Sequence, residues 1–130
     1  MKIFDTNQGC WSQKVNFVDA NNVLVGYDTE QECCEHAGWF IADKITPYDY
    51  DMETVTENAK DYNIELYSFD PDFFEIVESG HLDEGGQVAF KLVAESKPDL
   101  YLHLFNSHNG YYAHGFEIKH SGEVVNNGNL

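Results

Sequence analysis

Short hydrophobic runs near the start of the chain are rich in residues that favour β-strands. Two of these runs cover residues 15–18 and 23–27, and Asp19-Ala20-Asn21-Asn22 between them has the composition of a tight turn. We therefore predict a β-hairpin here. Immediately afterwards, Thr29-x-x-Glu32 matches a capping box, which predicts a short helix over about residues 30–39.

The middle of the chain has a less regular pattern. One set of apolar and aromatic side chains has helical spacing, namely Met52, Val55, Ala59 and Tyr62. The β-branched run at 54–56 favours a strand almost equally, so both alternatives stay open. Residues 64–69 alternate as in a strand, and Pro71 predicts a helical turn over 71–74.

The last third of the chain contains the clearest strand patterns. We predict strands over residues 87–94, 100–108 and 111–120, and a further strand over 123–125. Asn109-Gly110 is the strongest short signal for a two-residue hairpin loop, so the strands on either side of it should pair. Together these elements predict an α+β fold: an antiparallel β-sheet meander with one or two short helices, in a single compact domain of residues 1–130.

A two-residue loop at 109–110 also determines which side chains share a face of the predicted hairpin. Leu102 and Leu104 should point into the main core. The opposite face should carry aromatic residues and histidines, namely Tyr101, His103, Phe105, Tyr112, His114, Phe116 and Ile118. In this register His103 and His114 are diagonal neighbours, within reach of one shared ligand.

The charge balance of the chain is strongly acidic. Its 130 residues include 23 Asp and Glu against seven Lys and no Arg, which gives a net charge of −16. This charge argues against direct binding to nucleic acid or to anionic membranes. The lack of Arg and of a phosphate-binding Gly-rich loop argues against nucleotide chemistry. Cations and basic protein surfaces are the partners that the charge favours.

Cysteine use indicates a reducing compartment. The three cysteines, Cys10, Cys33 and Cys34, are an odd number and include a vicinal pair, which is a poor basis for disulfides. The N-terminal residues lack the apolar stretch of a signal peptide, and no apolar run is long enough to span a membrane. We therefore expect a cytoplasmic protein.

Cys33 and His36 form half of a candidate zinc site. At positions i and i+3 of the predicted helix they would present a thiolate and an imidazole on one side, and His103 or His114 could complete the coordination. Zinc is the one cofactor that the sequence suggests. The alternatives are a buried cysteine with hydrogen-bonded core histidines, or a small-molecule pocket lined by His103, His114 and nearby aromatic residues.

A cysteine nucleophile is disfavoured at the same place. Three carboxylates, Glu30, Glu32 and Glu35, surround the Cys33-Cys34 pair and oppose formation of a thiolate. No oxyanion-stabilising donor is recognisable either. The sequence therefore supplies no catalytic residues.

Residues 43–84 concentrate the negative charge. Thirteen carboxylates and two lysines give this segment a net charge of −11. A solvated surface is the ordinary explanation, but a net charge of about 2–8 is enough to keep a small domain soluble. The excess predicts a binding surface for a basic partner. Its candidate contact residues are Asp49, Asp51, Glu53 and Glu57, with Tyr48 and Tyr50 as aromatic anchors.

Two stretches of the sequence carry a family resemblance. They are CCEHAGWF at residues 33–40 and FNSHNGYYAHGF at residues 105–116. Together with residues 15–19, these stretches resemble a family of small proteins of unknown function from bacteria and their phages. The resemblance implies a bacterial or phage origin and assigns no catalytic residue.

These observations predict a non-enzymatic acidic protein that binds a basic protein surface. Small acidic inhibitors that mimic nucleic acid fit a phage setting, so a phage-type inhibitor is the more specific form of this hypothesis. The alternative is a module that binds zinc or a small ligand through its Cys/His cluster.

Overall fold

The computed structural model describes residues 1–7, 13–30, 36–48, 62–77, 84–108 and 114–130. This part of the chain contains nine β-strands and one short 3-10 helix. The strands are β1 (Lys2–Asn7), β2 (Gln13–Val18), β3 (Val23–Asp28), β4 (His36–Ala42), β5 (Ser68–Ile76), β6 (Glu84–Val93), β7 (Leu100–His108), β8 (Gly115–His120) and β9 (Glu123–Asn129), and the helix is η3 (Ile64–Leu66).

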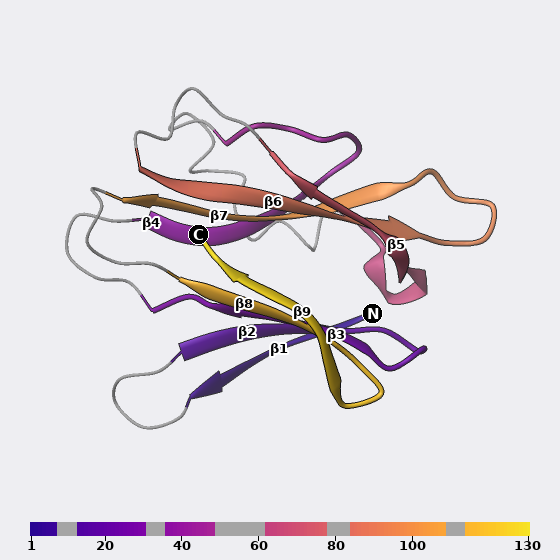
Figure 1. Ribbon diagram of the computed structural model, residues 1–130. Helices are drawn as coiled ribbons and strands as arrows, with labels where there is room; N and C mark the ends of the chain where they lie inside the picture. Colours follow the sequence, from indigo (N-terminus) through magenta and orange to yellow (C-terminus); the bar gives the residue numbers. More distant parts are fainter. Residues whose placement is uncertain (8–12, 31–35, 49–61, 78–83, 109–113) are drawn as a thin grey trace.

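The strands form two antiparallel sheets that stack as a sandwich (Figure 1). The first sheet has the order β1-β2-β3-β8-β9, and the second has the order β4-β7-β6-β5. The expectation of an antiparallel sheet is confirmed. The α+β assignment is wrong for the described residues, because strands account for nearly all of their regular structure and the only helix is a single 3-10 turn.

The main core lies between the two sheets. The first sheet contributes Phe17, Val25 and Tyr27, and the second contributes Trp39 and the leucines of β7, all of them buried. The rings of Phe17 and Trp39 meet edge to face with their centroids 5.1 Å apart, so they join β2 to β4 across the sandwich. Burial of each large apolar side chain stabilises the fold by roughly 1.5–3 kcal/mol.

The hairpin expected from residues 15–27 is confirmed as β2 and β3. The two strands pair in register from Lys14 opposite Asp28 to Val18 opposite Leu24. Alternate side chains of β3, at Val23, Val25 and Tyr27, face the core, as the period of a strand requires. Sequence reasoning succeeds here because the turn and both strands are close in the chain.

The helix expected over residues 30–39 is wrong where the structure describes it. Residues 36–42 form β4, which pairs with β7, and residues 31–35 lie outside the described part. On β4, Trp39 and Ile41 face the main core while Phe40 is buried on the opposite face. A strand that is apolar on both sides lacks the alternation of a half-exposed strand, and the local capping signal then favours the wrong element.

Two expectations for the acidic middle are also corrected. Residues 64–66 form the 3-10 turn η3, and the strand expected there begins only at Ser68. The helical turn expected at 71–74 is instead part of β5, whose pairing with β6 is interrupted by a bulge between Phe69 and Phe74. Pro71 fits this position because a bulge on an edge strand needs no ladder hydrogen bond from its nitrogen.

The hairpin expected at Asn109-Gly110 is wrong, because β7 and β8 lie in different sheets. β7 pairs with β4 and β6, whereas β8 pairs with β3 and β9. Leu102 and Leu104 do face the main core, as predicted. The predicted shared face breaks up, however, since Phe116 also lies in the main core while Phe105 is on the outer side of the second sheet. The expected strands at 87–94 and 123–125 are confirmed as β6 and β9.

A second, smaller core covers the outer side of the second sheet. We call it the outer cluster and define it as Phe40, Tyr48, His103 and Phe105. Phe40 stacks on His103 with ring centroids 4.4 Å apart, and Tyr48 stacks on Phe105 at 4.0 Å. All four side chains are almost completely buried.

Gly38 is required beneath this cluster, and its replacement by Ala should be destabilising. A Cβ atom at Gly38 would lie 3.1 Å from Cζ of Phe105, the residue directly opposite on β7. The ring cannot move away, because it is fully buried and stacked on Tyr48. We expect Gly38→Ala to lower the free energy of unfolding by about 1–3 kcal/mol, as overpacking usually does. Urea unfolding measures this change.

Gly115→Ala is the matched control. A Cβ atom at Gly115 would have its nearest contact at 3.5 Å, to Oδ1 of Asn129, which is an ordinary van der Waals distance. Its effect should stay within about 0.5 kcal/mol. Equal losses in the two variants would contradict the steric explanation for Gly38.

Candidate functional site

Residues 62–77 of the acidic segment follow one edge of the sandwich. Residues 62–77 contain four carboxylates and no lysine. Glu65 on η3 and Asp72 and Glu75 on β5 are exposed, and Asp70 is half-buried. β5 is the outermost strand of the second sheet. Four of the thirteen carboxylates of the acidic segment therefore lie along this edge, and three of them are exposed.

Exposed apolar side chains lie among these carboxylates. Leu66 is 60% exposed and Ile76 is 70% exposed. Phe74 is 37% exposed, although its ring also contacts the rings of Phe90 and Phe116 at centroid distances of 5.5 and 5.9 Å. We call this surface the acidic edge and define it as Glu65, Leu66, Asp70, Asp72, Phe74, Glu75 and Ile76.

Two described positive charges lie near the acidic edge: the Met1 amino group, which donates to the carbonyl of Glu65 at 2.9 Å, and Lys91. Lys91 lies opposite the β5 bulge, and its Nζ is 3.3 Å from Oδ2 of Asp99. The hydrogen bond and charge of Asp99 raise the pKa of Lys91, with a smaller contribution from Asp70. Lys91 thus forms an ion pair with Asp99 and also interacts electrostatically with Asp70 of the acidic edge.

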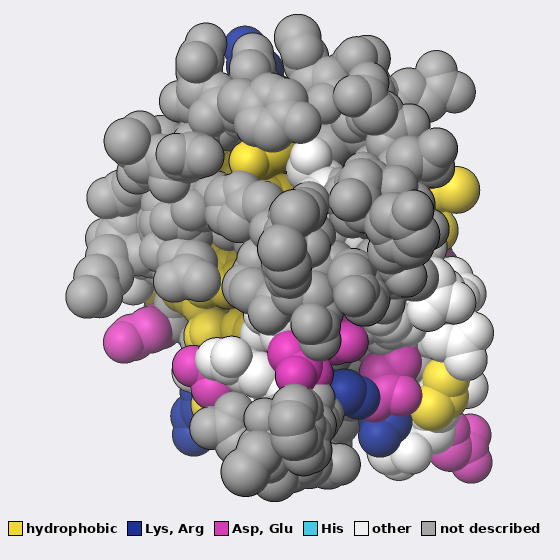
Figure 2. Space-filling view, turned by 90° about the vertical axis from the view of Figure 1, so that its left-hand side faces the viewer, with side chains coloured by type: hydrophobic (Ala, Val, Ile, Leu, Met, Phe, Trp, Pro, Cys, Tyr) yellow, Lys and Arg dark blue, Asp and Glu magenta, His cyan; other side chains and the backbone are white. Residues whose placement is uncertain are grey.

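The first sheet has a different charge arrangement. Nζ of Lys14 and Nζ of Lys119 lie 3.9 and 3.5 Å from Oε1 of Glu117, so this face mixes both signs of charge. Figure 2 views the end of the sandwich near the β3–β4 and β7–β8 connections, and described carboxylates and lysines lie beside each other there. Charge separation is thus a feature of the acidic edge and not of the whole surface.

The structure describes only one of the residues predicted to contact a partner. Asp49, Tyr50, Asp51, Glu53 and Glu57 lie outside the described part of the chain. Tyr48 is described and is fully buried against Phe105. In the described structure Tyr48 is therefore an internal packing residue, because the segment before it folds back over the second sheet, and its role as an aromatic anchor for a partner stays a prediction without support.

Gln87 holds this returning segment in place. Its Oε1 accepts a hydrogen bond from the backbone N–H of Tyr48 at 2.7 Å, and its Nε2 donates to the carbonyl of Thr46 at 2.7 Å. The backbone N–H of Thr46 in turn donates to Nε2 of His103 at 3.0 Å. We call residues 43–48 the strap, since they bind across the outer cluster immediately before the candidate contact residues at 49–57.

His103 is a structural acceptor in this arrangement. Its side chain is completely buried, and burial lowers its pKa to about 4, with partial compensation from the backbone of Tyr101 and Phe40. Within the described residues, Nδ1 has no hydrogen-bond partner. A metal at Nε2 would have to displace the strap, so this atom is not prepared to be a ligand.

His114 lies immediately before β8, where the chain enters the first sheet, and not beside His103 on β7. Its Nδ1 is 2.7 Å from the backbone carbonyl of Asp28 and 3.9 Å from that residue's Oδ1. Close by, the hydroxyl of Tyr27 donates to the carbonyl of Phe105 at 2.6 Å, which joins β3 to β7. The expected pairing of His103 and His114 on one hairpin face is wrong, because their strands belong to different sheets.

The structure describes only part of the predicted zinc half-site. Cys33 lies outside the described part, and His36 lies on β4 opposite Ser107, with its side chain also outside the description. Among the residues that the structure does describe, no group of three or more His, Cys, Asp or Glu side chains could hold a metal ion. Zinc binding through Cys33, His36, His103 and His114 stays a prediction, without support from the two histidines described.

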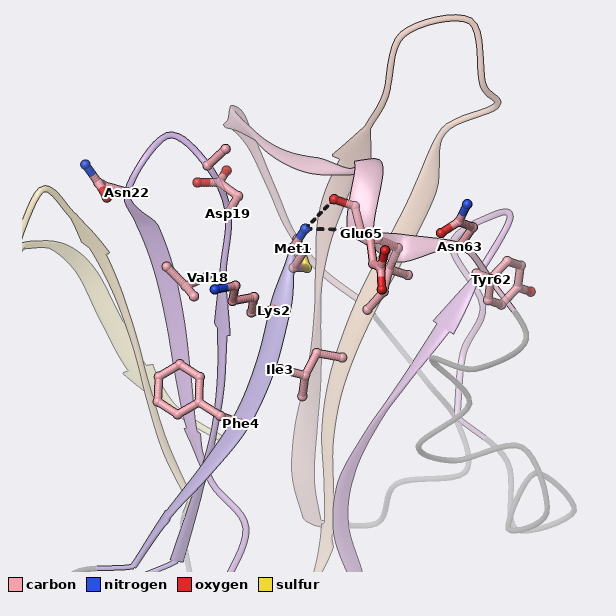
Figure 3. A pocket seen from close by; sticks show the side chains of 12 residues that line it. Met1, Lys2, Ile3, Phe4, Val18, Asp19, Asn22, Tyr62, Asn63 and Glu65 are labelled. Atoms are coloured by element: carbon pink, nitrogen blue, oxygen red, sulfur yellow. Dashed lines mark hydrogen bonds between the residues drawn. The ribbon is translucent and has the colours of Figure 1, made fainter.

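A pocket of about 1030 Å³ lies at the other end of the sandwich, between β1, the β2–β3 turn and η3 (Figure 3). Lys2, Phe4 and Val18 lie on one side of it, and Tyr62 and Glu65 lie on the other. The Met1 amino group donates to the carbonyls of Ile64 and Glu65, at 3.2 and 2.9 Å. These hydrogen bonds join the start of β1 to η3 beside the pocket. The polar groups of the pocket indicate no particular ligand.

Comparisons of the chain with protein-family models, curated proteins and solved structures found no match. The resemblance to bacterial and phage proteins therefore stays a prediction from the two sequence stretches. Within the described residues, no helix has the length and apolar character needed to cross a membrane.

Proposed function

We propose that this protein is a non-enzymatic acidic binding protein whose partner is a basic protein surface. One observation carries the proposal: the acidic edge combines three exposed carboxylates with exposed Leu66 and Ile76, and residues 62–77 contain no lysine. The candidate contact residues at 49–57 belong to the same segment of the chain.

The physical basis is the combination of charge with apolar area. Carboxylates attract a basic partner from a distance and accelerate association, whereas burial of apolar side chains provides much of the affinity once contact is made. A surface that served solubility alone would not need to expose Leu66 and Ile76 among its charges. Folding gains nothing from the excess charge either, since self-repulsion opposes the compact state.

A phage-type inhibitor that mimics nucleic acid is the more specific form of the proposal. The support is the charge of −11 in residues 43–84, together with the resemblance to proteins of bacteria and phages. Such an inhibitor would occupy the groove of a DNA- or RNA-binding protein. Competition by duplex DNA for a captured partner distinguishes mimicry from simple charge attraction.

Charge reversal on the acidic edge tests the proposed surface. We expect Asp72→Lys/Glu75→Lys to weaken capture of a basic partner from bacterial lysate by about tenfold or more, because attractive charges become repulsive. Wild-type capture should be strong at roughly 50 mM salt and weak at roughly 500 mM salt, where screening is much shorter in range. Quantitative mass spectrometry of the captured proteins measures both effects.

Asp5→Lys/Glu123→Lys is the matched control, since it makes the same change in net charge at exposed positions on β1 and β9, the two edge strands of the first sheet. This control should retain most of the capture. Equal weakening by both double variants would show that net charge matters and the acidic edge does not. Capture that is unaffected by salt would contradict the proposal.

A further inference from the structure

β9 is an edge strand that offers its whole length to solvent. In the described part of the chain it pairs only with β8, at the end of the first sheet (Figure 1). Six of its seven residues are exposed, and Gly128 is half-buried. Val124 and Val125 are 50% and 63% exposed. The strand therefore presents both an unpaired backbone edge and apolar side chains.

The other edge strands are better protected against pairing. Lysine, proline and covered faces are the usual devices that prevent one sheet edge from joining another. β1 carries exposed Lys2, β5 contains Pro71 and a bulge, and β4 is buried on both faces. β9 has neither lysine nor proline, and its only such device is a bulge where the register steps from Asn126 to Val124.

We propose that β9 pairs with β9 of a second copy of this chain, so that the two first sheets join across a two-fold axis. The charge distribution indicates that a second copy of the chain can bind at β9. Residues 100–130 contain Glu117, Glu123 and Lys119, a net charge of −1, against −11 for residues 43–84. Two copies that each carry −16 repel one another least where this neutral end of the chain forms the contact.

Charge repulsion also favours one direction of pairing between the two β9 strands. Glu123 at the start of β9 is its only charged residue. In a parallel pair the two Glu123 side chains would be neighbours and would repel each other. In an antiparallel pair that overlaps the full strand they lie roughly 20 Å apart, at about 3.3 Å per residue, which is beyond the screening length in physiological salt.

Sedimentation equilibrium of the purified chain at increasing protein concentration, without any partner, tests the proposal. The weight-average mass should rise from that of a monomer toward twice that value. The dimer should be favoured by roughly 500 mM over roughly 50 mM salt, because salt screens the repulsion between two acidic copies. Capture of a basic partner should depend on salt in the opposite sense, so each proposal can fail without the other.

Lysine substitution on β9 provides the decisive variant. Val124→Lys/Val125→Lys should weaken the dimer by about tenfold or more, because lysine on an edge strand opposes its pairing with a second strand and the two exposed apolar side chains are lost. Both positions are well exposed, so the variant should fold, and its urea unfolding curve shows whether it does. The control Leu66→Lys/Ile76→Lys makes the same change in charge at exposed apolar positions elsewhere and should leave the dimer unchanged.

The outcomes that overturn the proposal are specific. A monomer at all concentrations in both salts would show that β9 does not pair with itself. A dimer that persists in Val124→Lys/Val125→Lys, or that is lost equally in Leu66→Lys/Ile76→Lys, would place the contact elsewhere on the molecule.

Discussion

Replacing Asp19 with Ala should lower the free energy of unfolding by about 3–4 kcal/mol, a large effect for a single side chain. Asp19 is only 6% exposed, and its carboxylate accepts three backbone hydrogen bonds, each 2.9 Å long. Hydrogen bonds to a charged group contribute about 1.5–3 kcal/mol each, and their loss leaves buried N–H groups without partners.

The position of these three donors explains why the loss should be large. Oδ1 of Asp19 accepts from Asn21 and Val23 and so closes the β2–β3 turn. Oδ2 accepts from the N–H of Phe69 on β5, which belongs to the other sheet. One carboxylate therefore shapes a hairpin and also joins the two sheets of the sandwich.

Asp19→Asn separates these two contributions. An amide can keep an oxygen toward the turn, but its NH₂ group then meets the N–H of Phe69, and two donors cannot bond. We expect a smaller loss of stability than in Asp19→Ala. Relative to wild type, amide hydrogen exchange should accelerate more at Phe69 than in the β2–β3 turn. Asp70→Ala is the control, because among the described residues Asp70 accepts a hydrogen bond only from the exposed backbone N–H of Asp72. An Asp19→Ala loss no greater than that of Asp70→Ala would contradict this account.

The β2–β3 hairpin illustrates which parts of the fold the sequence could predict. Its strands alternate, its turn is polar, and all of its partners lie within 16 residues of one another. β6 and β9 were predictable for the same reason. The role of Asp19 at the turn could also have been suspected, since Asp commonly binds nearby backbone N–H groups in turns. Its bond to Phe69, 50 residues away, left no local signal.

β4 and the β7–β8 connection illustrate which parts it could not predict. A capping box and an Asn-Gly pair are local signals, and both compete here with pairing between distant strands. Residues 37–41 are buried on both faces only because the strap and the first sheet lie on opposite sides of them. That environment depends on the assembled sandwich, so a strand could not be distinguished from a helix by spacing.

The candidate site shows the same division. The charge of residues 43–84 was visible in composition, and three of its carboxylates, Glu65, Asp72 and Glu75, are exposed on one edge of the sandwich. The burial of Tyr48 was not visible in the sequence, because segments rich in carboxylates usually lie on the surface and a tyrosine within one is expected there too. The role of Gln87 was not predicted. A single glutamine in a strand gives no sequence pattern that would indicate its two hydrogen bonds to the backbone of the strap.

Acid should weaken the protein through His103, with most of the effect between about pH 6.5 and pH 4. Burial lowers the pKa of His103 to about 4 in the folded protein, whereas an unfolded histidine titrates near 6.5. Between these values the unfolded chain binds a proton that the folded chain does not. The stabilisation is therefore complete above about pH 6.5 and is lost as the pH falls, by about 3 kcal/mol in total.

The contacts of His103 explain why the folded protein resists protonation. Nε2 accepts the N–H of Thr46, so the neutral ring carries its proton on Nδ1. A proton on Nε2 would point at the Thr46 N–H group and remove the acceptor that holds the strap. The ring also stacks on Phe40 in a site without solvent, where a positive charge is costly.

Urea unfolding of wild type and His103→Gln from pH 7.5 to pH 3.5 measures this contribution. Glutamine can accept the Thr46 N–H but does not titrate, so it should be less stable than wild type at pH 7.5 through poorer packing, and the gap should close by about 3 kcal/mol toward pH 4. NMR titration of the His103 ring should give a midpoint near 4. A midpoint near 6.5, or a stability gap that stays constant with pH, would mean that the buried imidazole does not resist protonation and that the strap is not held through its Nε2 atom.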